Sequence, residues 1–142
     1  MCIRDSGWYD EPRTGPPHSE RGLLTERGLA HIVACVEAMK KVLGDEIGLA
    51  LDCGPGWTVK DAITFARTLE PFHITWLEDI ITGDYTPYPN AEVFREVTQS
   101  TSLPIHTGEQ IYLRENFKDL IEKQAVNVIG PDPEAVSYTH LS

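Results

Sequence analysis

Four short runs of strand-forming residues in this chain each end in a carboxylate. The acids that close the runs are Asp52, Glu78, Glu109 and Asp132. Helical patterns fill the gaps between the runs, and strands that alternate with helices usually lie parallel in one sheet. Because parallel strands place their C-terminal ends on one side, we expect these acids to converge at one mouth, where α/β barrels carry their active sites. Carboxylates gathered there would repel one another without a cation, and hard oxygen ligands suit Mg²⁺ or Mn²⁺.

The alternation of side chains along a strand supports this convergence. Successive strand residues face opposite sides of a sheet. In the third run, Glu109 therefore shares a face with Thr107, and we expect His106 on the opposite face in a structural role. The runs themselves are 48–51, 74–77, 104–108 and 126–131.

Apolar residues at helical spacing predict four helices between and before these runs. The first covers 25–43, with Thr25 as its N-cap and Gly44 after its end. The second begins at Thr58, within a capping-box pattern, and ends at Pro71. The third begins at Asn90, and the fourth covers about 113–124. The residues expected to point inward from these last two helices are Val93, Phe94, Val97, Phe117, Leu120 and Ile121. Segments 10–21 and 82–89 are rich in turn formers and indicate loops.

The length of the chain limits how much of a barrel it can build. A (β/α)₈ barrel takes about 250 residues, and this chain has 142. We therefore expect a partial α/β barrel of the TIM type, with about four strands. A net charge of −10 argues against binding to nucleic acids or to anionic membranes. Three cysteines do not make a disulfide framework, and neither a long apolar run nor a signal peptide is evident. These features predict a cytoplasmic protein.

The two ends of the chain do not fit a strand–helix repeat. Residues 1–6 and 136–142 can be written in codons that are reverse complements over most of their length, as in a translated sequencing adapter. We therefore expect both ends to be artefacts of library preparation, excluded from fold reasoning. On this hypothesis, residues 7–135 are an internal fragment of a longer gene and belong to its C-terminal barrel domain.

Four short motifs resemble the enolase superfamily, in its mandelate racemase and muconate-lactonizing branch, which includes sugar-acid dehydratases. They are Leu51-Asp52, Trp76-Leu77-Glu78-Asp79, Thr107-Gly108-Glu109 and Pro131-Asp132. The resemblance covers about residues 36–134. Each motif is short, but all four stand in the family's order and at the ends of the expected strands.

The resemblance implies a chemistry and a set of roles. A substrate carboxylate, on a sugar acid or 2-hydroxy acid, would bind Mg²⁺ while a base removes the adjacent proton and the metal stabilises the enediolate. Asp52, Glu78 and Glu109 match the family's metal ligands. Asp132 matches the acid that orients a histidine base on the next strand. The parent protein would be a lyase or isomerase (dehydratase, racemase or cycloisomerase) and a homo-oligomer.

The chain also departs from the family pattern. Gly54 stands where several branches have Asn or His, so a histidine acid is excluded there. Asp79 follows Glu78 directly, where many members have Glu-Pro or Gln-Pro. Because adjacent strand residues face opposite ways, we do not expect Asp79 to be a ligand. The family's Lys-x-Lys strand, histidine strand and capping domain are not in this sequence, and we expect the fragment alone to be inactive.

A plainer interpretation stays open beside this one. The strand-end acids could be unrelated helix caps or surface charges, with Asp132 capping a following helix. The chain would then be a non-catalytic α/β module, for example a doubly wound domain that binds a cation or a partner. A Lys-x-Lys strand upstream and an Asp/His pair downstream would decide for the enzyme.

Overall fold

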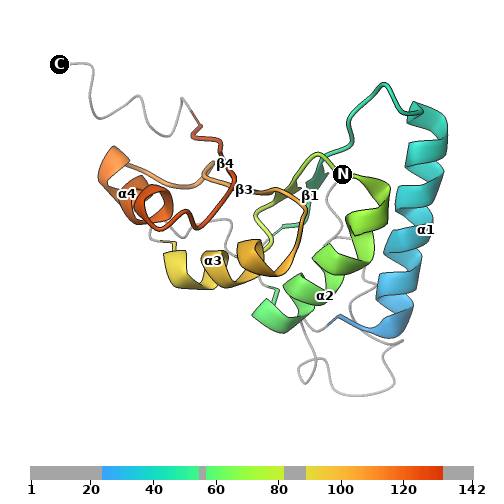
Figure 1. Ribbon diagram of the computed structural model, residues 1–142, viewed down its shortest axis with the longest axis horizontal. Coiled ribbons are helices and arrows are strands. Elements are labelled where there is room, and N and C mark those ends of the chain that lie inside the picture. Colours follow the sequence, from blue (N-terminus) through green and yellow to red (C-terminus); the bar gives the residue numbers. More distant parts are fainter. Residues whose placement is uncertain (1–23, 55–56, 82–88, 133–142) are drawn as a thin grey trace.

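Four parallel strands form one sheet in the computed structural model, which describes residues 24–54, 57–81 and 89–132. The strands lie in the order β1-β2-β3-β4 and alternate with helices along the chain, as Figure 1 shows. The strands are β1 (Leu51–Asp52), β2 (Leu77–Glu78), β3 (Ile105–Thr107) and β4 (Val128–Ile129), and the helices are α1 (Glu26–Leu43), α2 (Val59–Leu69), α3 (Ala91–Ser100) and α4 (Arg114–Glu122). This confirms the expected partial α/β barrel. The sequential order also argues against a doubly wound sheet, in which the order reverses.

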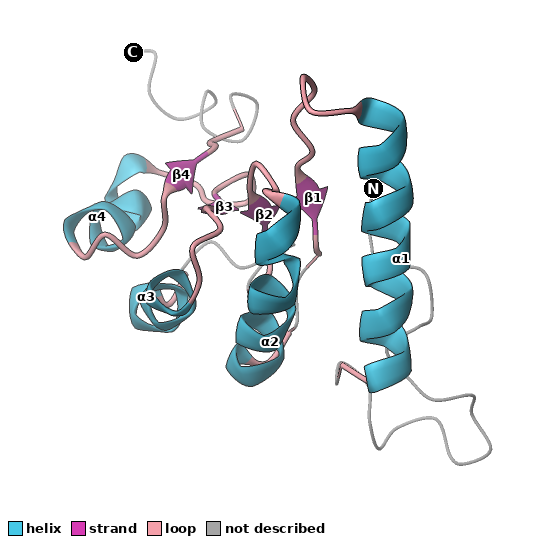
Figure 2. Cartoon of the chain, turned by 45° about the vertical axis from the view of Figure 1, so that its right-hand side comes forward, coloured by secondary structure: helices cyan, strands magenta, loops and turns pink. Residues whose placement is uncertain are grey.

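The register between strands separates the two faces of the sheet. Leu51 pairs with Leu77, and Leu77 with Ile105, and all three side chains are fully buried. Helices α1 to α4 are arrayed along one side of the row of strands in Figure 2. The apolar face of the sheet packs against them through side chains such as Phe65 and Phe94.

The opposite face carries polar side chains. Asp52 pairs with Glu78, and Glu78 pairs with His106. Side chains at paired positions of neighbouring strands point to the same side of a sheet. The prediction that His106 lies on the face opposite Thr107 is confirmed, but that face is the one that carries Glu78. The register places His106 beside Glu78, whereas Thr107 belongs to the face that the helices cover.

The predicted N-caps of three helices and the predicted C-cap of α1 are confirmed. The Thr25 hydroxyl accepts from Gly28 N at 3.0 Å, and Gly44 adopts φ 70° after α1. The Thr58 hydroxyl accepts from Asp61 N at 3.1 Å, and Asn90 caps α3 through Glu92 N. The three N-caps provide a hydrogen-bond acceptor to a backbone N–H that has no partner inside the helix, whereas Gly44 N donates to Lys40 O at 2.9 Å at the end of α1.

Two predicted apolar stripes extend further than the buried faces do. Ile121 on α4 is 59% exposed, so its expected inward position is wrong, whereas Phe117 and Leu120 are buried as expected. Val42, an apolar residue in the last turn of α1, is 85% exposed. The two terminal segments, the 10–21 loop and most of the 82–89 loop lie outside the described residues. Across the described ranges, no helix is both long and apolar enough to cross a membrane.

Candidate metal centre

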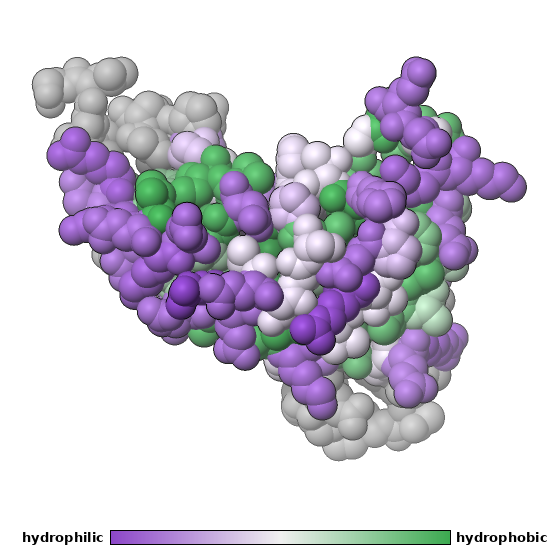
Figure 3. All heavy atoms as spheres, viewed as in Figure 1, coloured by the Kyte–Doolittle hydropathy of each residue, from purple (hydrophilic) through white to green (hydrophobic). Residues whose placement is uncertain are grey.

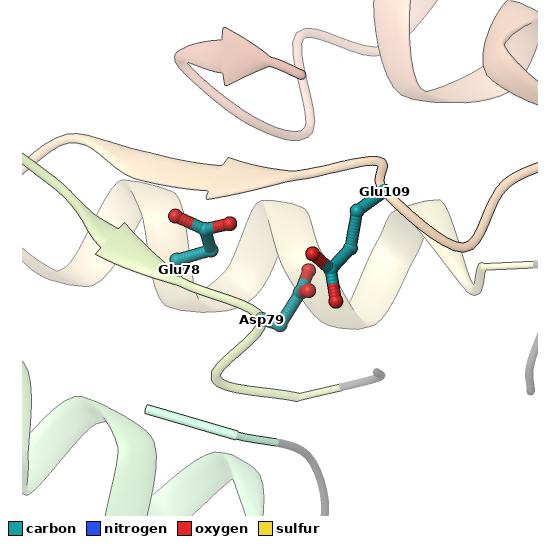
Figure 4. A group of neighbouring side chains, drawn as sticks. All are labelled: Glu78, Asp79 and Glu109. Atoms are coloured by element: carbon teal, nitrogen blue, oxygen red, sulfur yellow. The ribbon is translucent and has the colours of Figure 1, made fainter. Parts of the chain in front are cut away.

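Three carboxylates meet at the C-terminal ends of β2 and β3. Glu78, Asp79 and Glu109 each offer an oxygen, and these oxygens all lie within 4.8 Å of one another. Figure 4 shows Asp79 and Glu109 reaching toward each other from neighbouring segments, with Glu78 beside them. Asp79 is buried, Glu78 is half-buried and Glu109 is exposed. The cluster is therefore anchored in the protein on one side and open on the other.

Glu78 is held at the last position of β2. The indole Nε1 of Trp76, two residues earlier on the same face, donates to Glu78 Oε2 at 3.0 Å. His106 Nδ1 lies 3.6 Å from the same oxygen. The Glu78 backbone continues the sheet, because its carbonyl accepts from Cys53 N at 3.0 Å. Backbone and side-chain contacts together fix where this carboxylate points.

Asp79 joins the cluster because the strand stops before it. Its φ is 50°, in the left-handed region, where aspartate is among the residues most often found. That turn ends the alternation of side chains, so Asp79 does not point away from Glu78 as a strand residue would. Its Oδ1 accepts from the Thr107 hydroxyl at 2.5 Å. Asp79 thus lies beside Glu78 and Glu109 although adjacent strand residues face opposite ways, and its exclusion as a metal ligand stays a prediction.

Glu109 is placed by a turn as well. Gly108, just after β3, has φ 140°, and a Cβ added there would lie 3.1 Å from the Gly130 carbonyl oxygen. Gly108 also accepts from Ile111 N at 3.0 Å, which closes a turn around Glu109. Only glycine combines this backbone angle with so close an approach to β4. The turn, rather than strand alternation, directs the Glu109 side chain.

Asp52 and Asp132 are not members of the group of three. Asp52 is exposed at the end of β1, on the same side of the sheet as its register partner Glu78, and its Oδ1 accepts from Gly54 N at 3.0 Å. Asp132 is half-buried, past the end of β4. The ligand role of Asp52 and the orienting role of Asp132 stay predictions.

The electrostatics of the cluster favour a bound cation. Burial raises the pKa of Asp79 to about 7, together with the negative charges of Glu109, Glu78 and Asp52 and against the opposing effect of the Thr107 hydrogen bond. Asp52 is thus close enough to act on Asp79 through its charge. A carboxylate that resists ionisation among other acids is stabilised by a bound cation. The all-oxygen donor set, partly open to solvent, fits Mg²⁺ or Mn²⁺.

Sequence reasoning missed Asp79, Trp76 and His106 as members of this site. The signal for Asp79 was available, because the strand-like run ends at Glu78 and turn formers follow a few residues later. Trp76 lies two residues before Glu78, so strand alternation alone puts it on the same face, whereas the signal for His106 was weaker because it depends on the register between β2 and β3. A one-residue change of register moves every side chain to the other face.

The strand order and the acidic strand ends define an α/β-barrel protein with a carboxylate cluster at the C-terminal side of its sheet. Residues 14–137 match the protein family described as "Enolase C-terminal domain-like". The chain belongs to this family.

Individual relatives are similar over a limited part of their length. The D-xylonate dehydratase of Haloferax volcanii is 39% identical over 102 residues, which are 72% of this chain and 24% of that protein. A mandelate racemase/muconate lactonizing enzyme-like protein from Rubrobacter xylanophilus has a TM-score of 0.71 and 37% identity, covering 84% of this chain and 29% of that one. L-talarate dehydratase from Polaromonas, solved with Mg and L-glucarate, has a TM-score of 0.68 and 30% identity, and the match covers 76% of this chain and 29% of that one. The chain thus spans about a quarter of the length of the curated relatives it matches.

Proposed function

We propose that this chain is part of an enzyme that removes the proton next to the carboxylate of a sugar acid, with a divalent cation bound at the strand ends. The observation that carries the proposal is the meeting of Glu78, Asp79 and Glu109 within 4.8 Å, with the pKa of Asp79 raised to about 7. Such a cluster at the C-terminal ends of parallel strands is where a barrel enzyme holds its reactive groups.

The residues have distinct parts in this proposal. Glu78 and Glu109 bind the cation, Mg²⁺ or Mn²⁺, and Asp52 approaches as a third ligand from the same side of the sheet as Glu78. Asp79 adds negative charge from a buried position. A bound cation would offset the charge that develops on the substrate carboxylate when the proton leaves. Asp132 orients a histidine base that belongs to a following strand, as in the resemblance described above.

The substrate class rests on the relatives. A D-xylonate dehydratase and an L-talarate dehydratase are both similar to this chain at 30% identity or more. Both names denote dehydratases of sugar acids, so we favour dehydration over racemisation. Family membership over residues 14–137 favours this enzyme over a non-catalytic cation-binding module.

Replacement of Glu78 by Gln tests the cation site directly. Mn²⁺ binding to the purified chain is measured by electron paramagnetic resonance and Mg²⁺ binding by competition. The variant loses one anionic ligand, and we expect its affinity to fall by about tenfold or more. Glu37→Gln, an exposed position on α1, is the matched control. Equal affinities in wild type, Glu78→Gln and the control would show that the cluster is not a metal site.

A further inference from the structure

Two aromatic side chains flank one oxygen of Glu78. The Trp76 indole donates to Glu78 Oε2 at 3.0 Å, and His106 Nδ1 lies 3.6 Å from that same atom. The two rings stack on each other with centroids 5.4 Å apart and an interplanar angle of 26°. Glu78 lies in β2, Trp76 directly precedes β2, and His106 lies in β3. Neither aromatic residue belongs to the carboxylate group.

His106 is a buried ring with an unused hydrogen-bonding atom. The residue is 8% exposed, and its Nδ1 has no hydrogen-bond partner within the described part of the chain. The 3.6 Å separation from Glu78 Oε2 is longer than a hydrogen bond. A buried polar atom without a partner is uncommon and calls for an explanation. Here the ring nitrogen faces the carboxylate oxygen Oε2 of Glu78.

The backbone directly after β4 also restricts the position of the His106 ring. A Cβ added at Gly130 would lie 2.2 Å from His106 Nε2 and 2.6 Å from its Cε1. The imidazole therefore lies directly over the Gly130 backbone, in space that a side chain would occupy. Packed between Gly130 and the Trp76 indole, the ring has little freedom to turn its Nδ1 away from Glu78.

We propose that Trp76 and His106 are positioning residues that hold Oε2 of Glu78 and thereby present Oε1 to the cation. This inference rests on the proposed metal centre. A carboxylate whose orientation is fixed before binding loses less freedom when the cation arrives, so affinity rises without an additional ligand. In the cation-bound protein, the Nδ1–H of His106 donates to Oε2 beside the indole N–H.

The test compares variants that remove one donor at a time. Trp76→Phe keeps an aromatic ring but removes the N–H. His106→Leu removes the Nδ1 donor, whereas His106→Asn keeps an N–H near that position. Trp57→Phe is the matched control, because the Trp57 indole is also buried and donates to Cys53 O at 3.2 Å, away from Glu78. Mn²⁺ affinity of the 142-residue chain is the first measurement, and the indole ¹H–¹⁵N resonances during a Mg²⁺ titration are the second.

We expect Mn²⁺ affinity to fall by about tenfold in Trp76→Phe and in His106→Leu, to recover in His106→Asn, and to be unchanged in Trp57→Phe. Mg²⁺ should shift the Trp76 indole resonance and leave that of Trp57 in place. Equal losses in His106→Leu and His106→Asn would overturn the role of the His106 donor, and equal losses at Trp76 and Trp57 would overturn the role of the indole.

The two proposals fail in different ways. If the wild-type chain binds Mn²⁺ and Glu78→Gln does not, while Trp76→Phe and His106→Leu bind normally, the metal centre stands and the positioning role is wrong. If the wild-type chain binds Mn²⁺ no better than Glu78→Gln, the metal centre itself is wrong and the positioning role falls with it.

Discussion

At the scale of single residues, Asp79 shows how a short departure from regular structure builds the site. Asp79 follows β2 with φ 50° and adds a third carboxylate beside Glu78 and Glu109. Burial and three neighbouring acids raise its pKa to about 7, so its ionised form destabilises the fold unless a cation is bound. Active sites commonly keep groups that cost stability in this way.

Asp79→Asn is therefore expected to stabilise the chain in the absence of divalent cations. A carboxyl whose folded-state pKa rises from 3.8 to about 7 loses stability as pH climbs through that interval. Above pH 7 the loss in the free energy of unfolding is at most on the order of 4 kcal/mol, because one pKa unit corresponds to about 1.4 kcal/mol. Asn keeps the oxygen that accepts from Thr107. Thermal melts in EDTA at pH 5 and pH 8 measure the difference.

The same variant should bind Mn²⁺ more weakly, because it lowers the negative charge of the cluster. Asp45→Asn, at an exposed position between α1 and β1, controls for a change of net charge alone. A variant that melts at the same temperature as wild type at pH 8 would show that burial and the neighbouring acids do not disfavour the ionised form of Asp79 in the folded chain.

How much of this site can be predicted from sequence depends on which residues obey strand periodicity. Glu78 closes a regular strand and is identified by its position alone. Glu109 is identified by its place at the end of a strand-like run, but Gly108 rather than alternation directs its side chain. His106 required the β2–β3 register, which a single sequence does not reveal when the strands have two or three residues. Local patterns identify the end of each strand, while pairing between strands decides which side chains meet.

At the scale of elements, the caps were predictable and the buried faces only partly so. Caps depend on one local side chain, as at Thr25, Thr58 and Asn90. Burial depends on what packs against a helix. Ile121 and Val42 continue apolar stripes onto surfaces that nothing in the described chain covers. An amphipathic pattern predicts that a face will be covered, and it does not say which segment covers it.

Glu70 links two elements and gives a test at this scale. It follows α2, and its Oε1 accepts from the Thr101 hydroxyl at 2.9 Å and from Ser102 N at 2.7 Å, in the segment before β3. The Ser102 backbone N–H, followed by the Thr101 hydroxyl, holds the pKa of Glu70 below its usual value. Its stabilising effect is therefore present above the ordinary carboxyl pKa and is lost as pH falls through the lowered one.

Glu70→Gln should lower the melting temperature at pH 7, because a neutral amide oxygen accepts these two hydrogen bonds less strongly. The difference from wild type should shrink as pH falls through the lowered pKa of Glu70. Melts of wild type, Glu70→Gln and the α1 control Glu37→Gln across pH 2–7 measure it. A difference that stays constant over this range would show that the charge of Glu70 contributes nothing.

At the scale of the whole molecule, the described sheet has two unpaired edges and one face without helices. Strands β1 and β4 lie at its two ends. Figure 3 shows the surface hollowed between the part that carries α4 and the part that carries α1, with apolar atoms in the hollow. Strand edges and apolar surface of this kind are covered in a closed barrel. The relatives, of which this chain spans about a quarter, are long enough to complete one.

This geometry leads to the expectation that the 142-residue chain binds a cation without catalysing proton removal. The described carboxylates can hold Mg²⁺, but a general base must lie within hydrogen-bond reach of the proton it takes. His106, the histidine beside the cluster, is packed against Gly130 and Trp76 and is aimed at Glu78 rather than at the open side. The unpaired edges of β1 and β4 should also make the chain self-associate, which size-exclusion chromatography with light scattering would detect.

The decisive measurement is exchange of the proton next to the carboxylate for deuterium, followed by NMR across a panel of sugar acids and 2-hydroxy acids with Mg²⁺. We expect no exchange above that of the same mixture with EDTA. A protein that combines this chain with the remaining strands of a closed barrel should show exchange, and Asp132→Asn should then reduce it. Metal-dependent exchange by the 142-residue chain alone would show that it already contains the base, and would make His106 the first histidine to replace.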